Sequence, residues 1–142
     1  MSSAFFDTNV LLYLLTEDDA KADRAEQLMA VGGTISVQVL NEFAYVARRK
    51  YKAPWNAVRD SLMTMRVALP VEPMTLETHD LGLQIAERYR LSVFDGQLLA
   101  SATLAGCGLF YSEDMQDGQA IGALTIRNPF AEAVLCSRYR RC

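Results

Sequence analysis

The chain has 142 residues, of which 51% are apolar and 22% charged, and a formal net charge of −3, which is typical of one soluble globular domain. No apolar stretch is long enough to cross a membrane, so no membrane association is predicted, and the mild acidity argues against a non-enzymatic nucleic-acid coat, which needs a broad basic surface. Three cysteines without metal-ligand spacing, a single histidine and an N-terminus unlike a signal peptide predict a cytoplasmic protein without a histidine-rich zinc site.

Short apolar runs alternate with segments of helical periodicity along the chain. In chain order, we expect a strand at 3–6, a helix opening at 10–15, a helix from 18 or 19 to 29, a strand at 34–35, a helix from 36 to about 50, a helix at 54–67, a strand at 69–71, a helix from 75 to about 90, a helix at 94–105, and strands at 108–111 and 123–126. In the helix at 75–90, the side chains of Leu76, Leu83 and Ala86 are expected to face the core.

Alternating short strands and helices indicate a mainly parallel sheet with helices on both faces. We therefore predict a single three-layer α/β domain whose central sheet has about four to five short strands. The domain is expected to span residues 1–130. The tail at 131–142 receives no assignment.

Four acidic residues occur at the ends of predicted elements. Asp7 directly follows the first strand and Asp114 follows the strand at 108–111, whereas Glu42 and Asp95 lie on helices. In an open α/β sheet, ligands bind outside the carboxyl ends of the strands. The order of elements therefore predicts that these four carboxylates meet at one edge of the sheet.

Each acid also fits an ordinary structural role. Asp7 suits a helix N-cap, Glu42 a solvent-facing helix position, and Asp95 a variant of the capping box. Asp114 and Asp117 suit a turn beside a glycine. Only the convergence of several acids distinguishes a functional site from this explanation.

Four short motifs resemble those of PIN-domain proteins, and more narrowly of the VapC-type toxins of bacterial toxin–antitoxin pairs. The resemblance covers nearly the whole chain. The residues that match the four motifs are Phe5-Phe6-Asp7-Thr8-Asn9, Ser36 with Asn41-Glu42-Phe43, Asp95 with Ala100-Ser101-Ala102, and Ser112-Glu113-Asp114. The Asn-Pro-Phe sequence at 128–130 is also similar to family members. The resemblance implies a PIN-like nuclease domain over residues 1–130.

The same resemblance implies hydrolysis of RNA phosphodiester bonds assisted by a divalent metal. Clustered carboxylates repel one another unless a cation compensates them, and oxygen ligands suit Mg²⁺, with Mn²⁺ as a substitute. Our hypothesis gives Asp7, Asp95 and Asp114 direct or water-bridged metal contact, while Glu42 orients the attacking water or completes a second metal site. Asp114 is favoured over Asp117 as the primary ligand. The supporting residues of this hypothesis are Thr8, Asn9, Ser112 and Asp117.

The resemblance also implies two protein partners. A cognate VapB-like antitoxin would block the acidic site, and a second copy of the chain would form a homodimer, for which the apolar faces of the helices between Ser36 and Val67 are candidate surfaces if they do not belong to the core. Whether the enzyme acts as a toxin or in routine RNA processing stays open.

Two features admit more than one interpretation. The basic run Arg48, Arg49, Lys50 and Lys52 indicates a solvated face or a nucleic-acid contact, and Trp55 suits either packing against a helix or stacking on a base. A non-catalytic phosphoacceptor or RNA-binding module remains the alternative class. A phosphoacceptor module needs adjacent acids near the N-terminus, and Asp18 and Asp19 instead follow the first helix.

Overall fold

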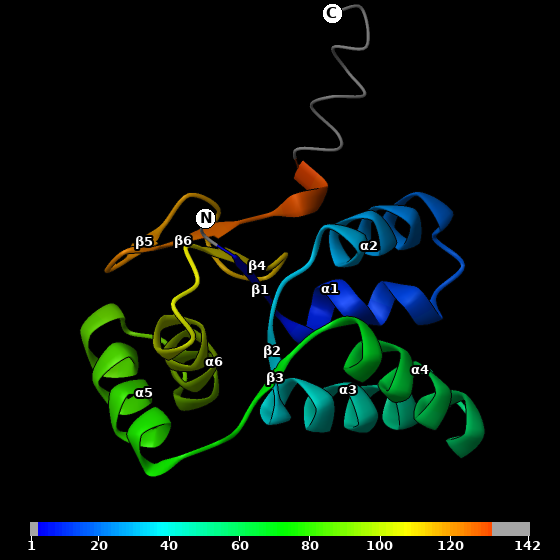
Figure 1. The fold of residues 1–142 in the computed structure, drawn as a ribbon, viewed down its shortest axis with the longest axis horizontal. Coiled ribbons are helices and arrows are strands. Elements are labelled where there is room, and N and C mark those ends of the chain that lie inside the picture. Colours follow the sequence, from blue (N-terminus) through cyan, green and yellow to red (C-terminus); the bar gives the residue numbers. More distant parts are fainter. Residues whose placement is uncertain (1–2, 132–142) are drawn as a thin grey trace, which may run out of the picture.

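A mainly parallel sheet forms the centre of the computed structural model, which describes residues 3–131 (Figure 1). Its four strands lie in the order β1-β4-β6-β5, where β1 is Ala4–Phe6, β4 is Leu109–Tyr111, β6 is Leu124–Arg127 and β5 is Ala120–Ile121. The β1–β4 and β4–β6 pairs are parallel, and β5 pairs with β6 in the antiparallel direction. The predicted α/β class is confirmed, but β5 was not predicted from the sequence.

Two further short strands extend the sheet on the side of β1. β2 (Ile35–Ser36) pairs in parallel with β3 (Val71–Glu72), and an isolated parallel bridge joins Thr34 to Phe5 in β1. Gly33 permits this approach, because a Cβ atom there would lie 2.8 Å from the carbonyl oxygen of Ala4 and would also meet the ring of Phe6. The carboxyl ends of β1, β2 and β4 therefore point the same way.

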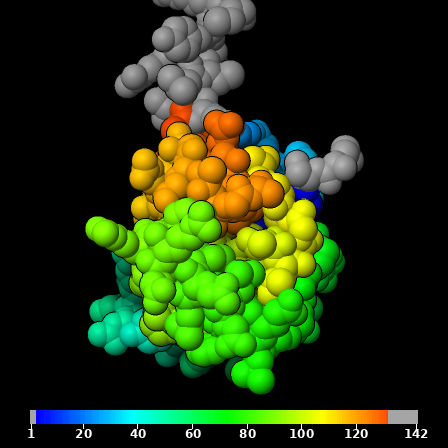
Figure 2. Space-filling model, turned by 90° about the vertical axis from the view of Figure 1, so that its left-hand side faces the viewer, coloured from blue at the N-terminus to red at the C-terminus, as the bar shows by residue number. Residues whose placement is uncertain are grey.

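Helices cover both sides of these strands. The helices on one side are α1 (Thr8–Leu12), which continues into the 3₁₀ turn η1 (Tyr13–Leu15), α2 (Asp19–Val31), α3 (Val37–Arg49) and α4 (Trp55–Ala68). On the other side, α5 (Leu76–Tyr89) packs against α6 (Val93–Leu104) (Figure 1). Figure 2 shows α5 at the surface of this side, below the β5–β6 hairpin.

Side chains of the strands and the inner helix faces form one core. Phe5 and Phe110 are paired across β1 and β4, and their rings stack with centroids 5.5 Å apart. Phe6, Phe43 and Ile126 are fully buried around them. Phe43 of α3 and Met65 of α4 thus belong to this core, whereas other apolar residues of α4, such as Val67, are exposed.

The predicted orientation of α5 is wrong at two positions. The side chain of Leu76 is 81% exposed and that of Leu83 is 42% exposed. The buried positions of α5 are Thr78, Gly82, Ile85 and Ala86, a stripe with helical spacing that faces α6. Small side chains at the contact bring the two helices close together and leave the larger leucines outside.

Two further points concern membrane spans and the C-terminal tail. Among residues 3–131, no helix is both long and apolar enough to span a membrane. The tail at 131–142 lies, apart from Ala131, outside the described residues, so its role and the domain boundary at 130 stay predictions.

Candidate active site

Asp7 lies at the carboxyl end of β1 and is the N-cap of α1. Its Oδ1 atom accepts a hydrogen bond from the Thr8 amide at 2.7 Å. Its Oδ2 atom accepts hydrogen bonds from the Ser112 hydroxyl at 2.8 Å and from the Asn9 side-chain amide at 3.1 Å. Only 6% of Asp7 is exposed. Asp7 therefore caps α1 and also presents a buried carboxylate whose orientation is fixed by hydrogen bonds.

The loop after β4 is fastened to the start of α1. The Asn9 side-chain carbonyl accepts a hydrogen bond from the Glu113 amide at 3.1 Å. The Glu113 carboxylate in turn accepts hydrogen bonds from the Tyr13 hydroxyl and from the Lys21 ammonium group, both at 2.6 Å. These contacts place Asp114, the next residue, beside Asp7.

Glu42 is held on the other side of Asp7 by residues of two helices. Its Oε2 atom accepts a hydrogen bond from the Thr8 hydroxyl, and its Oε1 atom accepts one from the Gln38 side-chain amide, each at 3.0 Å. The same Gln38 nitrogen donates to the carbonyl oxygen of Phe94 at 3.0 Å. Gln38, which sequence reasoning missed, thus links α3 to the first turn of α6.

Asp95 lies in that first turn of α6. The Ser92 hydroxyl caps the helix by accepting a hydrogen bond from the Asp95 amide at 3.0 Å. The next residue, Gly96, packs so closely on α5 that a Cβ atom there would collide with the carbonyl oxygen of Gly82. The packing of two helices therefore determines where the Asp95 carboxylate lies.

Asp114 and Asp117 are separated by the structure. Asp114 lines the pocket that Asp7 also lines, whereas the Asp117 carboxylate accepts a hydrogen bond from the backbone amide of Asn128 at 2.8 Å and is not among the lining residues. The geometry thus brings together four of the predicted acids and leaves Asp117 in a structural contact near β6.

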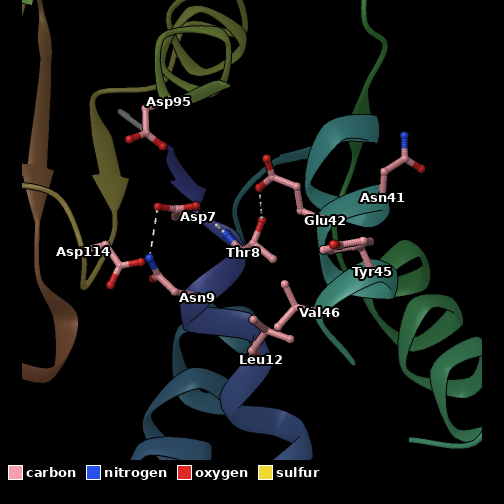
Figure 3. Close-up of a pocket in the computed structure, with 10 residues that line it drawn as sticks. All are labelled: Asp7, Thr8, Asn9, Leu12, Asn41, Glu42, Tyr45, Val46, Asp95 and Asp114. Carbon is pink, nitrogen blue, oxygen red and sulfur yellow. Dashed lines mark hydrogen bonds between the residues drawn. The ribbon is translucent and has the colours of Figure 1, made fainter. Parts of the chain in front are cut away.

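The four acids line one pocket of about 560 Å³ at the carboxyl edge of the sheet. Figure 3 shows Asp7 in the middle, with Asp95 and Asp114 on one side and Glu42 on the other. The remaining lining residues are Thr8, Asn9, Leu12, Asn41, Tyr45 and Val46. Each acid comes from a different segment: the β1–α1 junction, α3, α6 and the loop after β4.

The environment of Asp7 disfavours its ionised form. Burial raises the pKa of Asp7 from the ordinary 3.8 to about 7, the hydrogen bonds from Ser112 and Thr8 oppose this rise, and the nearby charges of Asp95 and Glu42 add to it. A carboxylate in this position gains from any cation that enters the pocket.

The pKa of Asp95 is also raised, by burial first and by the charges of Glu42 and Asp114, while the hydrogen bond with Ser92 lowers it.

Such a set of oxygen ligands with unbalanced negative charge fits a hard divalent cation. In residues 3–131, no three His, Cys, Asp or Glu side chains are arranged to hold an ion by themselves. Mg²⁺ in proteins is commonly bound by only one or two carboxylates and keeps several waters, so these acids fit Mg²⁺ without forming such a set.

Comparison with known families agrees with the motifs. The family model described as the PIN domain matches residues 4–117. The chain belongs to the PIN domain family. No curated protein sequence matches it.

Solved structures share this PIN-domain fold at low sequence identity. A toxin–antitoxin complex from Klebsiella pneumoniae matches with a TM-score of 0.69 and 19% identity, covering 89% of this chain and 98% of that one. VapBC2 from Rickettsia felis bound to a promoter DNA fragment gives 0.64 and 18%, covering 88% and 97%. VapC20 from Mycobacterium tuberculosis, described as a sarcin–ricin loop cleaving toxin, gives 0.59 and 22%, covering 79% and 92%.

Two kinds of residue around the PIN-domain pocket had no signal in the sequence. Gln38 is one turn before Glu42, a spacing that allows their side chains to interact, but nothing in the sequence shows that α6 approaches it. Tyr45 and Val46 follow Glu42 on the same helix and line the pocket, but an aromatic or apolar residue at either position is common in helices and does not by itself indicate a site.

Proposed function

We propose that this protein is a metal-dependent endoribonuclease and the toxin of a VapBC-type toxin–antitoxin pair. The observation that carries the proposal is the convergence of Asp7, Glu42, Asp95 and Asp114 on one pocket of a PIN domain. Such a site concentrates negative charge where a phosphodiester, itself an anion, has to bind. It is suited to this substrate only when divalent cations fill it.

The proposed roles follow from how each acid is held. Asp7, Asp95 and Asp114 bind Mg²⁺, or Mn²⁺ in its place, directly or through water. When bound, the ion lowers the pKa of an attacking water and neutralises charge on the phosphate. Glu42 is fixed from both sides and orients the attacking water or completes a second metal site.

Four uncharged or peripheral residues support these acids. Asn9 and Ser112 orient the Asp7 carboxylate, and Thr8 bonds both Asp7 and Glu42. Asp117 fixes the loop after β4 through its contact with Asn128. We expect substitution of Thr8, Asn9 or Ser112 to weaken catalysis by misplacing the acids, and substitution of Asp117 to have a much smaller effect.

The proposed partners rest on the similar structures. Several of these are complexes of a toxin with its antitoxin, among them VapBC from Salmonella typhimurium bound to DNA, at 19% identity and a TM-score of 0.63. A VapB-like antitoxin that covers the acidic pocket would inhibit this chain. We further propose a cytoplasmic homodimer.

The decisive test uses purified full-length protein and end-labelled RNA, with Mg²⁺, with Mn²⁺ or with EDTA. An Asp7→Asn variant purified in parallel controls for contaminating ribonucleases. We expect cleavage that requires the metal and disappears in the variant. Equal cleavage by both proteins, or cleavage in EDTA, would contradict the proposal; RNA binding without cleavage would identify a binding module instead.

A further inference from the structure

A cationic and aromatic surface adjoins the acidic pocket. It consists of Tyr45, Arg48 and Arg49 at the end of α3 and Trp55 at the start of α4, which together with Ala44 line a shallow pocket of about 310 Å³. We call these four residues the Arg–aromatic shelf. Tyr45 lines both this shelf and the acidic pocket, so the two sites are adjacent.

The shelf holds its guanidinium groups in defined positions. The Arg48 guanidinium lies 4.6 Å from the centroid of the Trp55 ring and donates a hydrogen bond to the carbonyl oxygen of Ala53 at 2.9 Å. The Arg49 guanidinium lies 5.8 Å from the Tyr45 ring. Neither pairs with a carboxylate in residues 3–131. Their positive charge is therefore available to an anion.

The aromatic rings of the shelf are exposed beyond what packing within the chain requires. Tyr45 is 62% exposed and Trp55 is 53% exposed. Aromatic faces beside arginines form the surface on which single-stranded nucleic acid binds, because the bases stack on the rings and the phosphates pair with the guanidinium groups.

The shelf also has the right position relative to the acids. Glu42, Tyr45 and Arg49 lie on α3 at spacings of three and four residues, so they form one stripe along the helix. Glu42 and Arg49 are about 10 Å apart along the helix axis, close enough for one extended strand to contact both. The acidic pocket repels the substrate backbone, and the shelf supplies the nearby attraction.

We propose that the Arg–aromatic shelf binds the single-stranded RNA segment next to the cleaved phosphodiester. This inference rests on the proposed function. Arg48 and Arg49 pair with backbone phosphates, and Tyr45 and Trp55 stack with bases. The proposal gives Arg48, Arg49 and Trp55 a role in substrate binding, which residues of an ordinary solvated face would not have.

The test measures binding of fluorescein-labelled single-stranded RNA in the full-length Asp7→Asn background, which prevents cleavage. The combined change Arg48→Gln with Arg49→Gln should weaken binding by about ten-fold or more and should make the affinity less dependent on salt, because two phosphate contacts are lost. Trp55→Leu should weaken binding by about five-fold or more through lost stacking.

Arg88→Gln is the matched control. Arg88 lies 5.5 Å from the ring of Tyr89 on α5, so it forms a similar cation–aromatic pair on another helix, and its loss should change the affinity by less than about two-fold. Melting temperatures establish that each variant is folded. In the cleavage-competent protein, the shelf variants should raise KM with little change in kcat.

Three outcomes separate the possibilities. If the wild-type protein cleaves RNA but the shelf and control variants bind RNA equally well, the shelf proposal fails while the proposed function stands. If the wild-type protein does not cleave RNA, the proposed function itself fails. If the double variant converts a dimer into a monomer in light scattering without weakening RNA binding, the shelf is an interface between two copies and the proposal is overturned.

Discussion

The two sides of the acidic pocket are built in different ways. On the strand side, Asp7 is held by hydrogen bonds from Thr8, Asn9 and Ser112, which all follow the ends of paired strands. On the helix side, Glu42 and Asp95 are placed by the packing of α3, α5 and α6 and by the single bridge through Gln38. One side depends on strand pairing and the other on helix contacts.

This difference determines how each side should respond to change. On the strand side, Asp7 and Ser112 are buried and are held at the ends of the paired strands β1 and β4, so substitutions there should alter charge and chemistry while the fold persists. On the helix side, a substitution that shifts one helix against another should also move Glu42 or Asp95. Variants whose cleavage activity and stability are both measured can therefore test this difference between the two sides.

The largest effect on the cleavage rate should come from neutralising one of the two aspartates in the loop after β4. Asp114→Asn should lower the rate of RNA cleavage by about 100-fold or more, the loss typical of removing one preorganised charged or polar group at a reacting centre. Asp117→Asn, three residues further on, should leave the rate within a few-fold of the wild type, since it removes only a contact to the amide of Asn128. The reverse ranking would transfer the metal-binding role to Asp117.

The next effect is a dependence of stability on pH. Because the folded-state pKa of Asp7 is about 7 and the ordinary value is 3.8, the folded protein binds more protons than the unfolded chain between these values. In metal-free protein, the stabilisation from protonated Asp7 should therefore be complete below about pH 4 and should be lost, by up to about 4 kcal/mol, as the pH rises from there through 7. The other acids also make the stability depend on pH. Comparing the wild type with a variant that lacks only the Asp7 carboxylate cancels their contribution.

Asp7→Asn isolates this contribution. In EDTA, the difference in melting temperature between the variant and the wild type should shift in favour of the variant between pH 5 and pH 8, and added Mg²⁺ should reduce the difference at pH 8 by stabilising the ionised wild type. Melting curves that stay parallel across this range would show that Asp7 ionises without cost.

The third effect tests the helix side through its closest contact. Gly96→Ala should destabilise the fold by about 1–3 kcal/mol, since the added Cβ would meet the carbonyl oxygen of Gly82 and the Cβ atom of Ala86. It should also lower cleavage by moving Asp95. Thr103→Ala, at an exposed position of the same helix, should change stability by less than about 0.5 kcal/mol. A Gly96→Ala protein as stable and active as the wild type would show that α5 does not position α6.

Much of the strand side could be predicted from the sequence because it depends on short-range patterns. The strand-then-acid order placed Asp7 and Asp114, and the predicted helix starts after Ser36 and at Thr75 are observed with their side-chain caps. The hairpin strand β5 escaped prediction, since it has only two residues, and its pairing with β6 is not visible in so short a pattern.

The helix side was less predictable because it depends on contacts between distant segments. Leucine periodicity predicted that Leu76 and Leu83 would face the core, but the close contact of α5 with α6 selects small residues and turns both leucines outward. Likewise, the position of Asp95 follows from Gly82 and Gly96, whose close approach no single-helix pattern reveals.

At Gln38, a small effect on stability is expected together with a larger effect on activity, so this residue tests the helix side most directly. Its Nε2 atom bridges Glu42 and the carbonyl of Phe94, while its buried Oε1 atom has no hydrogen-bond partner. Gln38→Leu removes the two hydrogen bonds but also removes an unsatisfied buried acceptor, and these opposing terms should leave the free energy of unfolding within about 1 kcal/mol of the wild type. Cleavage should nevertheless fall by about ten-fold or more, as for residues that orient a functional group, because Glu42 keeps only its contact with Thr8. Urea unfolding and the cleavage rate measured on the same preparation separate the two effects, and Gln38→Glu is the control that places a second negative charge against Glu42 and should lower both. If Gln38→Leu cleaves RNA at the wild-type rate, Glu42 is positioned without the bridge, and the link between α3 and α6 is structural only.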